Sequence, residues 1–253
     1  MLEDLRGKTV LVTGASVGIG AAASLGFAKQ GADVAVHYNK NKQAAEDVCA
    51  AIRKLGVKAV AIGGDLSVAG TARRVVEEAA KQLGRLDILL NNAGAIIDRV
   101  PFLELGSGLY EAALDLNVRP VIEASQAAVP YMEKQGGGAI INVGSIAGVN
   151  GGGAGSGHYA CAKAYVHNLT RHMATDLASR KIRVNAISPG VIETAFHAAT
   201  PPERMEAMKK SVPLGRAGTP EDCVGPILFL ASSSMSGYVS GQIVHVNGGQ
   251  YMG

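Results

Sequence analysis

The sequence has no tryptophan, only four phenylalanines and only three cysteines among its 253 residues. The cysteines, Cys49, Cys161 and Cys223, are widely spaced and odd in number, which matches no metal-ligand motif and suits free thiols in a reducing compartment. We therefore expect no metal site and a cytoplasmic protein. The scarcity of aromatic residues predicts a largely aliphatic core.

Long apolar runs and dense charge are also missing. No apolar stretch reaches about 18 residues without a polar interruption, so no membrane span is expected. The first residues carry acidic side chains and no apolar segment, which excludes a secretory signal there. The net charge is +3, and no basic run is interleaved with aromatics, so the sequence gives no support for a nucleic-acid partner.

Apolar runs alternate with helical patterns along almost the whole chain. Most of the apolar runs are continuous, as is typical of parallel strands covered on both faces. This order predicts an α/β fold, a doubly wound Rossmann-type parallel sheet of about seven strands with helices on both faces. The expected strands are Thr9–Thr13, Asp33–Tyr38, Lys58–Ile62, Leu86–Asn91, Gly138–Val143, Arg183–Ser188 and Gln242–Val246. The expected helices are Ile19–Gln30, Lys42–Leu55, Ala69–Leu83, Ser107–Lys134, His158–Arg180 and Pro220–Ser232.

No linker or composition break divides the chain, so residues 1–253 are expected to form a single domain. One segment, residues 191–213, breaks the alternation. It follows a strand, contains Pro201-Pro202 and includes a short amphipathic helix at Glu203–Lys210. An excursion at the carboxyl end of a strand is where an α/β enzyme would hold a substrate lid, and a passive surface insertion is the alternative.

Tyr159 and Lys163 lie four residues apart in a helical stretch, so their side chains share one face. A tyrosine hydroxyl has a pKa of about 10 and is a weak acid-base catalyst alone. A cation at ~4 Å supplies about 4 kcal/mol at an effective dielectric near 20, enough to lower that pKa by about three units. The pair is therefore a candidate catalytic pair, and an incidental helix surface is the alternative.

A glycine-rich loop, Gly14-Ala-Ser16-Val17-Gly18-Ile19-Gly20, joins the first expected strand to the first helix. Glycines let a backbone turn tightly against a pyrophosphate, and the helix N-terminus offers free amides and the positive end of its dipole. The position between strand and helix makes this a dinucleotide-binding candidate.

With these motifs the chain resembles the short-chain dehydrogenase/reductase family, over essentially its whole length. Further matches are Asn91-Asn92-Ala93-Gly94, Asn117, Ser145 and Pro189-Gly190 with Thr194. The resemblance implies an oxidoreductase that interconverts a ketone and a secondary alcohol. The cofactor contacts that it implies fall on Gly14, Ser16, Val17, Gly18, Ile19, Gly20, Tyr38, Asn39, Lys40, Asp65, Leu66, Asn92, Ala93, Gly94, Tyr159, Lys163, Pro189, Gly190, Ile192 and Thr194.

The resemblance also implies catalytic roles. Tyr159 would exchange a proton with the substrate oxygen, and Ser145 would hydrogen-bond that oxygen. Lys163 would lower the pKa of Tyr159 and bind the nicotinamide ribose. Asn117 would hold a water that connects Lys163 to solvent, or would be a satisfied structural amide. The hydride would belong to the cofactor.

The end of the second strand bears on cofactor choice. Folds of this kind select NAD with an acidic side chain there, whereas this chain has Tyr38-Asn39-Lys40. NADP is therefore favoured over NAD, although Val17 stands where NADP-using relatives often carry a basic residue. Asp65-Leu66 resembles the adenine-contacting pair of the family.

The link from Ser145 to Tyr159 spans fourteen positions, where close relatives usually show thirteen. The glycine-rich run Gly151–Gly157 can absorb the extra residue, and we expect a floppy or open pocket wall there.

The resemblance is closest to 3-oxoacyl-carrier-protein reductases and to NAD-dependent sugar or polyol dehydrogenases, and the sequence does not choose among small carbonyl or alcohol substrates. Other classes considered are a non-enzymatic dinucleotide-binding regulator and a lyase or epimerase that retains its cofactor. By resemblance a homotetramer is expected.

Overall fold

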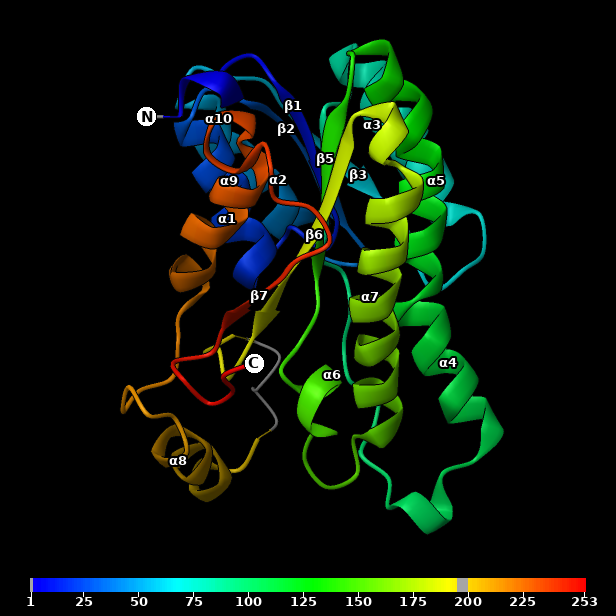
Figure 1. The fold of residues 1–253 in the computed structure, drawn as a ribbon, viewed down its shortest axis with the longest axis vertical. Coiled ribbons are helices and arrows are strands. Elements are labelled where there is room, and N and C mark those ends of the chain that lie inside the picture. Colours follow the sequence, from blue (N-terminus) through cyan, green and yellow to red (C-terminus); the bar gives the residue numbers. More distant parts are fainter. Residues whose placement is uncertain (1, 195–199) are drawn as a thin grey trace.

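Seven parallel strands form one sheet in the computed structural model, which describes residues 2–194 and 200–253 (Figure 1). The strand order is β3-β2-β1-β4-β5-β6-β7. This arrangement confirms the predicted doubly wound α/β fold. The strands are β1 (Thr9–Val12), β2 (Asp33–Tyr38), β3 (Ala59–Gly63), β4 (Ile88–Asn91), β5 (Gly138–Val143), β6 (Ile182–Pro189) and β7 (Ile243–Val246).

Helices cover both faces of this sheet. On one face α1 packs against α2 and α9, and on the other α3 packs against α5, with α7 beside β6 (Figure 1). The helices are α1 (Gly18–Lys29), α2 (Lys42–Arg53), α3 (Thr71–Leu83), α4 (Ser107–Asn117), α5 (Arg119–Lys134), α6 (Ala147–Asn150), α7 (Gly157–Asp176), α8 (Pro202–Lys210), α9 (Val224–Ala231) and α10 (Ser233–Ser236). Short 3-10 turns are η1 (Glu3–Leu5), η2 (Phe102–Glu104), η3 (Ala178–Arg180) and η5 (Pro220–Cys223).

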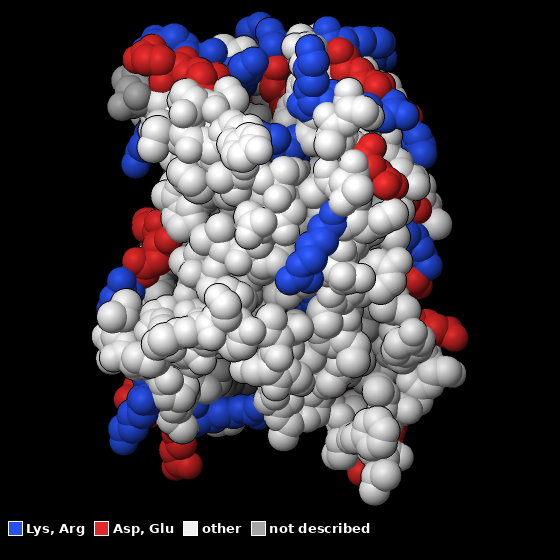
Figure 2. All heavy atoms as spheres, viewed as in Figure 1, with Lys and Arg blue, Asp and Glu red and all other residues white. Residues whose placement is uncertain are grey.

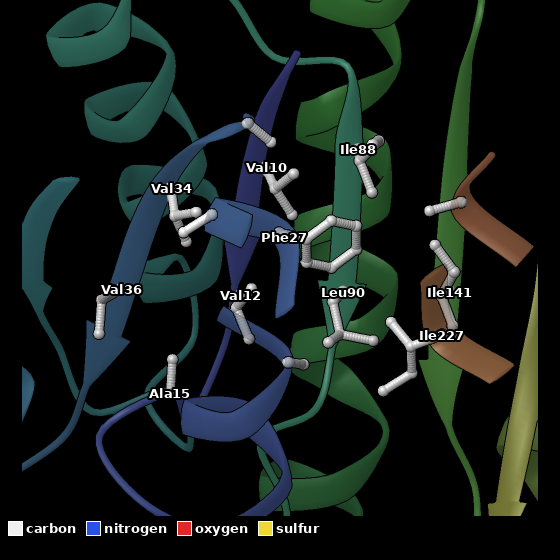
Figure 3. Close-up of a cluster of buried hydrophobic side chains, with 14 of the residues drawn as sticks. Val10, Val12, Ala15, Phe27, Val34, Val36, Ile88, Leu90, Ile141 and Ile227 are labelled. Atoms are coloured by element: carbon white, nitrogen blue, oxygen red, sulfur yellow. The ribbon is translucent and has the colours of Figure 1, made fainter. Parts of the chain in front are cut away.

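The core is aliphatic and lies in two layers, one on each face of the sheet. Val10 and Val12 of β1 point toward Phe27 of α1, whereas Leu11 between them joins the opposite layer (Figure 3). Alternate residues of a strand face opposite sides, so a continuous apolar run fills both layers. Many small branched side chains therefore fill the core in the absence of tryptophan.

The expected helix Ser107–Lys134 is two helices, and the single-helix prediction is wrong. The chain breaks at Val118, whose backbone angles are φ −116° and ψ −55°. Pro120 stands in the first turn of α5, where its missing N–H needs no partner. Inside one continuous helix it would clash with the carbonyl four residues earlier, so the proline enforces the break.

Other boundaries shift by one to four residues: α7 ends at Asp176, and η3 completes the expected helix His158–Arg180 as a 3-10 turn. The expected helix Pro220–Ser232 likewise begins as η5. None of the helices in the described ranges has the length and apolarity to cross a membrane.

The order of the strands reverses between β1 and β4. From β1 the chain first adds β2 and β3 on one side, then crosses to β4, β5, β6 and β7 on the other. At such a switch point the loops beyond the strand ends diverge and leave a crevice, the usual place for a ligand in a doubly wound sheet.

Candidate active site

The glycine loop lies at this switch point, after β1. Gly14 and Gly18 have φ of +62° and +58°, a region that side-chain-bearing residues rarely adopt. A Cβ on Gly20 would lie 2.5 Å from the Gly14 carbonyl oxygen, so the helix can approach the loop only without a side chain there. Helix α1 begins at Gly18 with no side-chain cap from Val17, which leaves its first amides available to an anion.

His37 of β2 holds this loop in place. The Gly14 N–H donates to His37 Nδ1 at 3.0 Å, so the proton of the neutral ring is on Nε2, which donates to the Gly64 carbonyl at 2.9 Å. Burial lowers the pKa of His37, in keeping with this neutral form. The sequence motifs gave no sign of this supporting role of His37.

The loop after β4 holds the glycine loop from the other side. Asn92 Nδ2 donates to the Thr13 and Gly14 carbonyls at 2.8 and 3.0 Å. The backbone N–H groups of Asn92 and Ala93 donate to Thr13 Oγ1. The Asn-Asn-Ala-Gly motif therefore ties the carboxyl ends of β1 and β4 together.

Ser145, Tyr159 and Lys163 come together beyond the end of β5. Tyr159 and Lys163 lie on one face of α7, with Lys163 Nζ 5.7 Å from the centre of the Tyr159 ring. The two side chains are 7% and 4% exposed. Lys163 Nζ donates to the Val143 carbonyl at 2.8 Å, which anchors the ammonium to β5.

Burial dominates the electrostatics of this pair. Burial raises the pKa of Tyr159 to about 12, and the hydrogen bond with Ser145 offsets only part of that rise. Burial also lowers the pKa of Lys163 to about 8. Burial of the phenol therefore sets the net direction of its pKa in the protein alone, and the lowering of that pKa by Lys163 stays a prediction.

Asn117, at the end of α4, is fully buried and is hydrogen-bonded to its surroundings. Its Oδ1 accepts from the Ala95 N–H at 3.1 Å, and its Nδ2 donates to the carbonyls of Ala95 and Ala113. Both amide hydrogens are thus used, and only a second lone pair on Oδ1 remains for a water. These bonds favour the structural role, and the role as a water holder stays a prediction.

Gly94 brings Asn117 and Lys163 close together. A Cβ on Gly94 would lie 2.6 Å from Asn117 Oδ1 and 3.1 Å from Lys163 Nζ. Glycine at this position therefore lets the loop after β4 pass over the lysine.

His167 supports Ser145 from behind, and sequence reasoning missed it. Its Nε2 accepts from the Ser145 N–H at 3.4 Å, and a Cβ on Gly144 would lie only 2.1 Å from the same nitrogen. His167 stands four residues beyond Lys163, on the same face of α7, and this spacing is the signal that could have found it. Burial lowers its pKa to about 4, with a further contribution from the charge of Lys163.

One cavity of about 310 Å³ collects most of the predicted site residues. It is lined by Gly14, Val17, Gly18, Ile19, Asn92, Gly94, Ser145, Tyr159, Lys163, Pro189, Gly190, Ile192 and Thr194, together with Ala95, Val143 and Gly144. Thr194 Cγ2 lies 3.3 Å from where a Cβ on Gly18 would be, so the segment after β6 closes over the glycine loop.

A second cavity of about 300 Å³ lies near the ends of β2 and β3 and includes Asn39, Lys40 and Asp65. The Asp65 carboxylate accepts from the N–H and hydroxyl of Ser67, which lowers its pKa. The remaining predicted residues line neither cavity; they are Ser16, Gly20, Tyr38, Leu66, Ala93 and Asn117. The Leu66 side chain belongs to the core, at 3% exposure.

The glycine-rich link between Ser145 and Tyr159 forms a wall with few side chains. It includes α6 and then residues 151–157, which border a cavity of about 250 Å³. The Gly155 carbonyl accepts from the Val100 N–H at 3.0 Å, which fastens the wall to the loop after β4. His158 also lines this cavity at 3% exposure, and neither ring nitrogen has a hydrogen-bond partner among the described residues.

The segment expected to be a lid runs from residue 191 to 213. Ile192 pairs with Gly218 in a parallel bridge, and α8 matches the expected helix at Glu203–Lys210 with one added residue. Residues 195–199 of this segment, Phe196 among them, lie outside the described ranges.

The two cavities fit the two ends of a dinucleotide. Positive-φ glycines and an uncapped helix N-terminus face the larger cavity, where a pyrophosphate would be held, and Lys163 lies at the end toward Tyr159. A nicotinamide cofactor would supply a transferable hydride there.

Comparison with known proteins gives a consistent result. Residues 14–250 match the family model described as enoyl-(acyl carrier protein) reductase. The chain is 41% identical to L-rhamnose 1-dehydrogenase (NAD(P)(+)) of Sphingomonas sp., with 99% of each chain covered. It is 39% identical to 3-oxoacyl-[acyl-carrier-protein] reductase of Staphylococcus aureus, over 97% of this chain and 98% of that one.

A solved structure shares the fold at high similarity. The structure of 7 alpha-hydroxysteroid dehydrogenase with NADH and 7-oxo glycochenodeoxycholic acid superimposes with a TM-score of 0.91 and 38% identity. The match covers 99% of this chain and 98% of that one.

Proposed function

The chain belongs to the short-chain dehydrogenase/reductase family, and from this premise we propose that it is an NADP(H)-dependent enzyme with Tyr159 as its general acid/base. Its relatives are NAD(P)-dependent enzymes that act on alcohols or ketones, and the chain is an oxidoreductase of this kind. The proposal is that it interconverts a ketone and a secondary alcohol by hydride transfer.

One observation carries this proposal. Ser145, Tyr159 and Lys163 line the same cavity as Gly14 and Gly18 of the glycine loop. A carbonyl oxygen placed at the Tyr159 hydroxyl would also meet the Ser145 hydroxyl, since the two side chains are hydrogen-bonded. Two hydroxyl donors directed at one oxygen stabilise the negative charge that develops on that oxygen during the reaction.

The protonation states suit reduction at neutral pH. With a pKa of about 12, Tyr159 holds its proton and can donate it to a carbonyl oxygen. The Lys163 ammonium stabilises negative charge left on the phenol oxygen after the proton is given. In the oxidation direction Tyr159 must first lose its proton, so that direction should need alkaline pH.

Replacement of Tyr159 by phenylalanine tests this assignment. Tyr159→Phe keeps the ring and removes the proton, so kcat for ketone reduction should fall about 100- to 10,000-fold. The measurement is nicotinamide absorbance at 340 nm against a panel of ketones, with about the wild-type free energy of unfolding as the control for folding. Turnover at the wild-type rate would exclude Tyr159 as the acid.

The preference for NADP rests on the second cavity. Lys40 lines it together with Asp65 and Asp115, and the end of β2 itself, Tyr38-Asn39-Lys40, carries no acidic residue to repel a 2′-phosphate. A lysine and a phosphate form a charge-assisted hydrogen bond that an unphosphorylated ribose cannot form.

Lys40→Ala is therefore expected to weaken NADPH binding about 10-fold and to change NADH binding little. Titration followed by nicotinamide fluorescence measures both. Lys54→Ala removes the same charge beyond the far end of α2 and serves as the matched control. Tighter binding of NADH than NADPH by the unaltered protein would reverse the preference.

We further propose that the chain is one domain that forms a homotetramer in the cytoplasm. Figure 2 shows a face with few charged side chains over α7 and β7, which supports association between copies of the chain.

The free thiols of Cys49, Cys161 and Cys223 support a reducing compartment. Ile192 and Thr194, at the start of the 191–213 segment, line the larger cavity, which supports the proposed lid.

A further inference from the structure

Two arginines meet the glycine wall from opposite sides. Arg99 follows β4, and its Nη1 donates to the Ala154 carbonyl at 3.4 Å. Arg204 comes from α8, and its Nη2 lies 3.0 Å from where a Cβ on Gly153 would be. The glycine wall that both arginines meet joins Ser145 to Tyr159 along the chain, and both of these residues line the catalytic cavity.

Neither guanidinium forms an ion pair with a carboxylate in the part of the chain that the structure describes. The nearby acids have other partners: Asp98 accepts from the Arg99 backbone N–H, and Glu193 and Glu206 pair with Lys209. Burial and the positive charge of Arg204 lower the pKa of Arg99. Two like charges thus lie near each other, and neither is paired directly with a carboxylate among the described residues, an arrangement that favours binding an anion.

The glycine run makes this arrangement possible. A Cβ on Gly153 would press against the Arg204 guanidinium, and one on Gly155 would lie 3.3 Å from Arg99 Cβ and 3.1 Å from the Val100 nitrogen. Gly155 also has a φ of +74°, which favours glycine. The run thus serves to admit both arginines to one wall, in addition to absorbing a change in length.

We propose that Arg99 and Arg204 form an anion subsite that binds the carboxylate of an oxo-acid substrate while its ketone reaches Tyr159. This inference rests on the proposed ketone reductase activity and adds the substrate class. A planar guanidinium matches a carboxylate with two parallel hydrogen bonds. Because the two arginines come from the loop after β4 and from α8, one carboxylate held between them would also draw α8 against the glycine wall.

Matched substrates test the subsite in the intact enzyme with its nicotinamide cofactor. The probes are levulinate and its longer straight-chain homologues, each compared with its primary amide. The amide keeps the ketone and the size and removes the charge. We expect wild-type kcat/KM to favour an oxo-acid over its amide by at least about 10-fold, with the difference largely in KM.

Substitutions of the two arginines test whether they cause the preference for the oxo-acid over its amide. Arg99→Gln and Arg204→Gln should each lower kcat/KM for the preferred oxo-acid about 10- to 100-fold and leave its amide within about 3-fold of wild type. Lys210→Gln removes a charge at the end of the same helix, away from the wall, and should change neither substrate.

The outcomes separate this inference from the proposed function. Turnover of amides and acids at equal rates, unchanged by either arginine variant, would overturn the subsite and leave the reductase activity standing. No turnover of any ketone, with Tyr159→Phe indistinguishable from wild type, would overturn the proposed function. A 3-oxoacyl-carrier protein as the preferred substrate, with free oxo-acids insensitive to both variants, would assign the arginines to a protein partner and also overturn the subsite.

Discussion

His167 shows how much of the site depends on a buried neutral histidine. Its Nε2 must stay unprotonated to accept from the Ser145 N–H, and its neighbours on one side include the Lys163 ammonium. His37 does the same for Gly14 at the other end of the cavity. Protonation of either ring would remove the acceptor and add a second positive charge, so both residues link the site to pH.

The lowered pKa of His167 predicts loss of stability in acid. In the unfolded chain its pKa is near 6.5, and in the folded protein it is about 4. Between these values only the unfolded state takes up the proton, so the free energy of unfolding falls as pH decreases from 6.5 to about 4. The loss should be on the order of 2 kcal/mol.

Urea unfolding at a series of pH values measures this loss. His167→Leu should reduce the dependence on pH in that window, because the titrating group is gone. His172→Leu, on the exposed side of the same helix, should not. An unchanged pH dependence in His167→Leu would show that the imidazole is not the group responsible.

The motif residues were largely predictable from the sequence, whereas the residues that hold them in place were not. Gly14, Ser145, Tyr159 and Lys163 stand at fixed spacings that the chain shows directly. His37 could not be found in this way, because its role depends on Gly14 in the loop after a neighbouring strand. Nothing in linear spacing shows that contact.

At the scale of elements, close packing of α1 against the loops fixes the cofactor cradle. Gly20 is the contact point, where a Cβ would lie 2.5 Å from the Gly14 carbonyl oxygen and 2.6 Å from Asn92 Nδ2. Both neighbours are themselves hydrogen-bonded, so neither can move without loosening the loop.

Gly20→Ala should therefore lower the free energy of unfolding by about 1–3 kcal/mol, and cofactor affinity by about 10-fold or more. Denaturant unfolding and fluorescence titration measure the two effects. Gly225→Ala in α9 is the matched control, since a Cβ there meets nothing within 4 Å and alanine favours the helix. A Gly20→Ala protein as stable as wild type would mean that α1 can shift freely.

Element boundaries show where local patterns are insufficient. The run Ser107–Lys134 reads as one helix by its apolar spacing, yet the chain bends at Val118 and lets Asn117 turn to Ala95. Pro120 was a local signal for this break. That the bend serves to clamp the loop after β4 depends on the neighbouring strand, which the local sequence does not show.

At the scale of the whole molecule, the distribution of charge is uneven. Cys161, Ala164, Tyr165 and Asn168 are exposed and uncharged on α7, and the charged Arg171 and Asp176 are exposed in its last two turns. Cys161 is exposed within one chain, whereas Cys49 and Cys223 are buried. Tyr238 beyond α10 is also fully exposed, on the layer opposite α7.

Burial of such a face between copies predicts the oligomeric state. Light scattering after size exclusion should give a mass four times that of the chain. Tyr165→Glu should lower that mass, because a carboxylate would be buried without a partner. Leu55→Glu, at an exposed position after α2, should not. A monomer at micromolar concentration in the unaltered protein would contradict the proposal.

The sequence by itself determined the fold class, the glycine loop and the residues that carry the chemistry, because strand and helix periodicity and short motifs are local properties of the chain. Only the tertiary structure decided the pKa direction of Tyr159, the histidines behind the loops and the meeting of Arg99 with Arg204. Burial and the interaction of charges through space depend on neighbours that are far apart in sequence, so these properties appear only once the chain has folded.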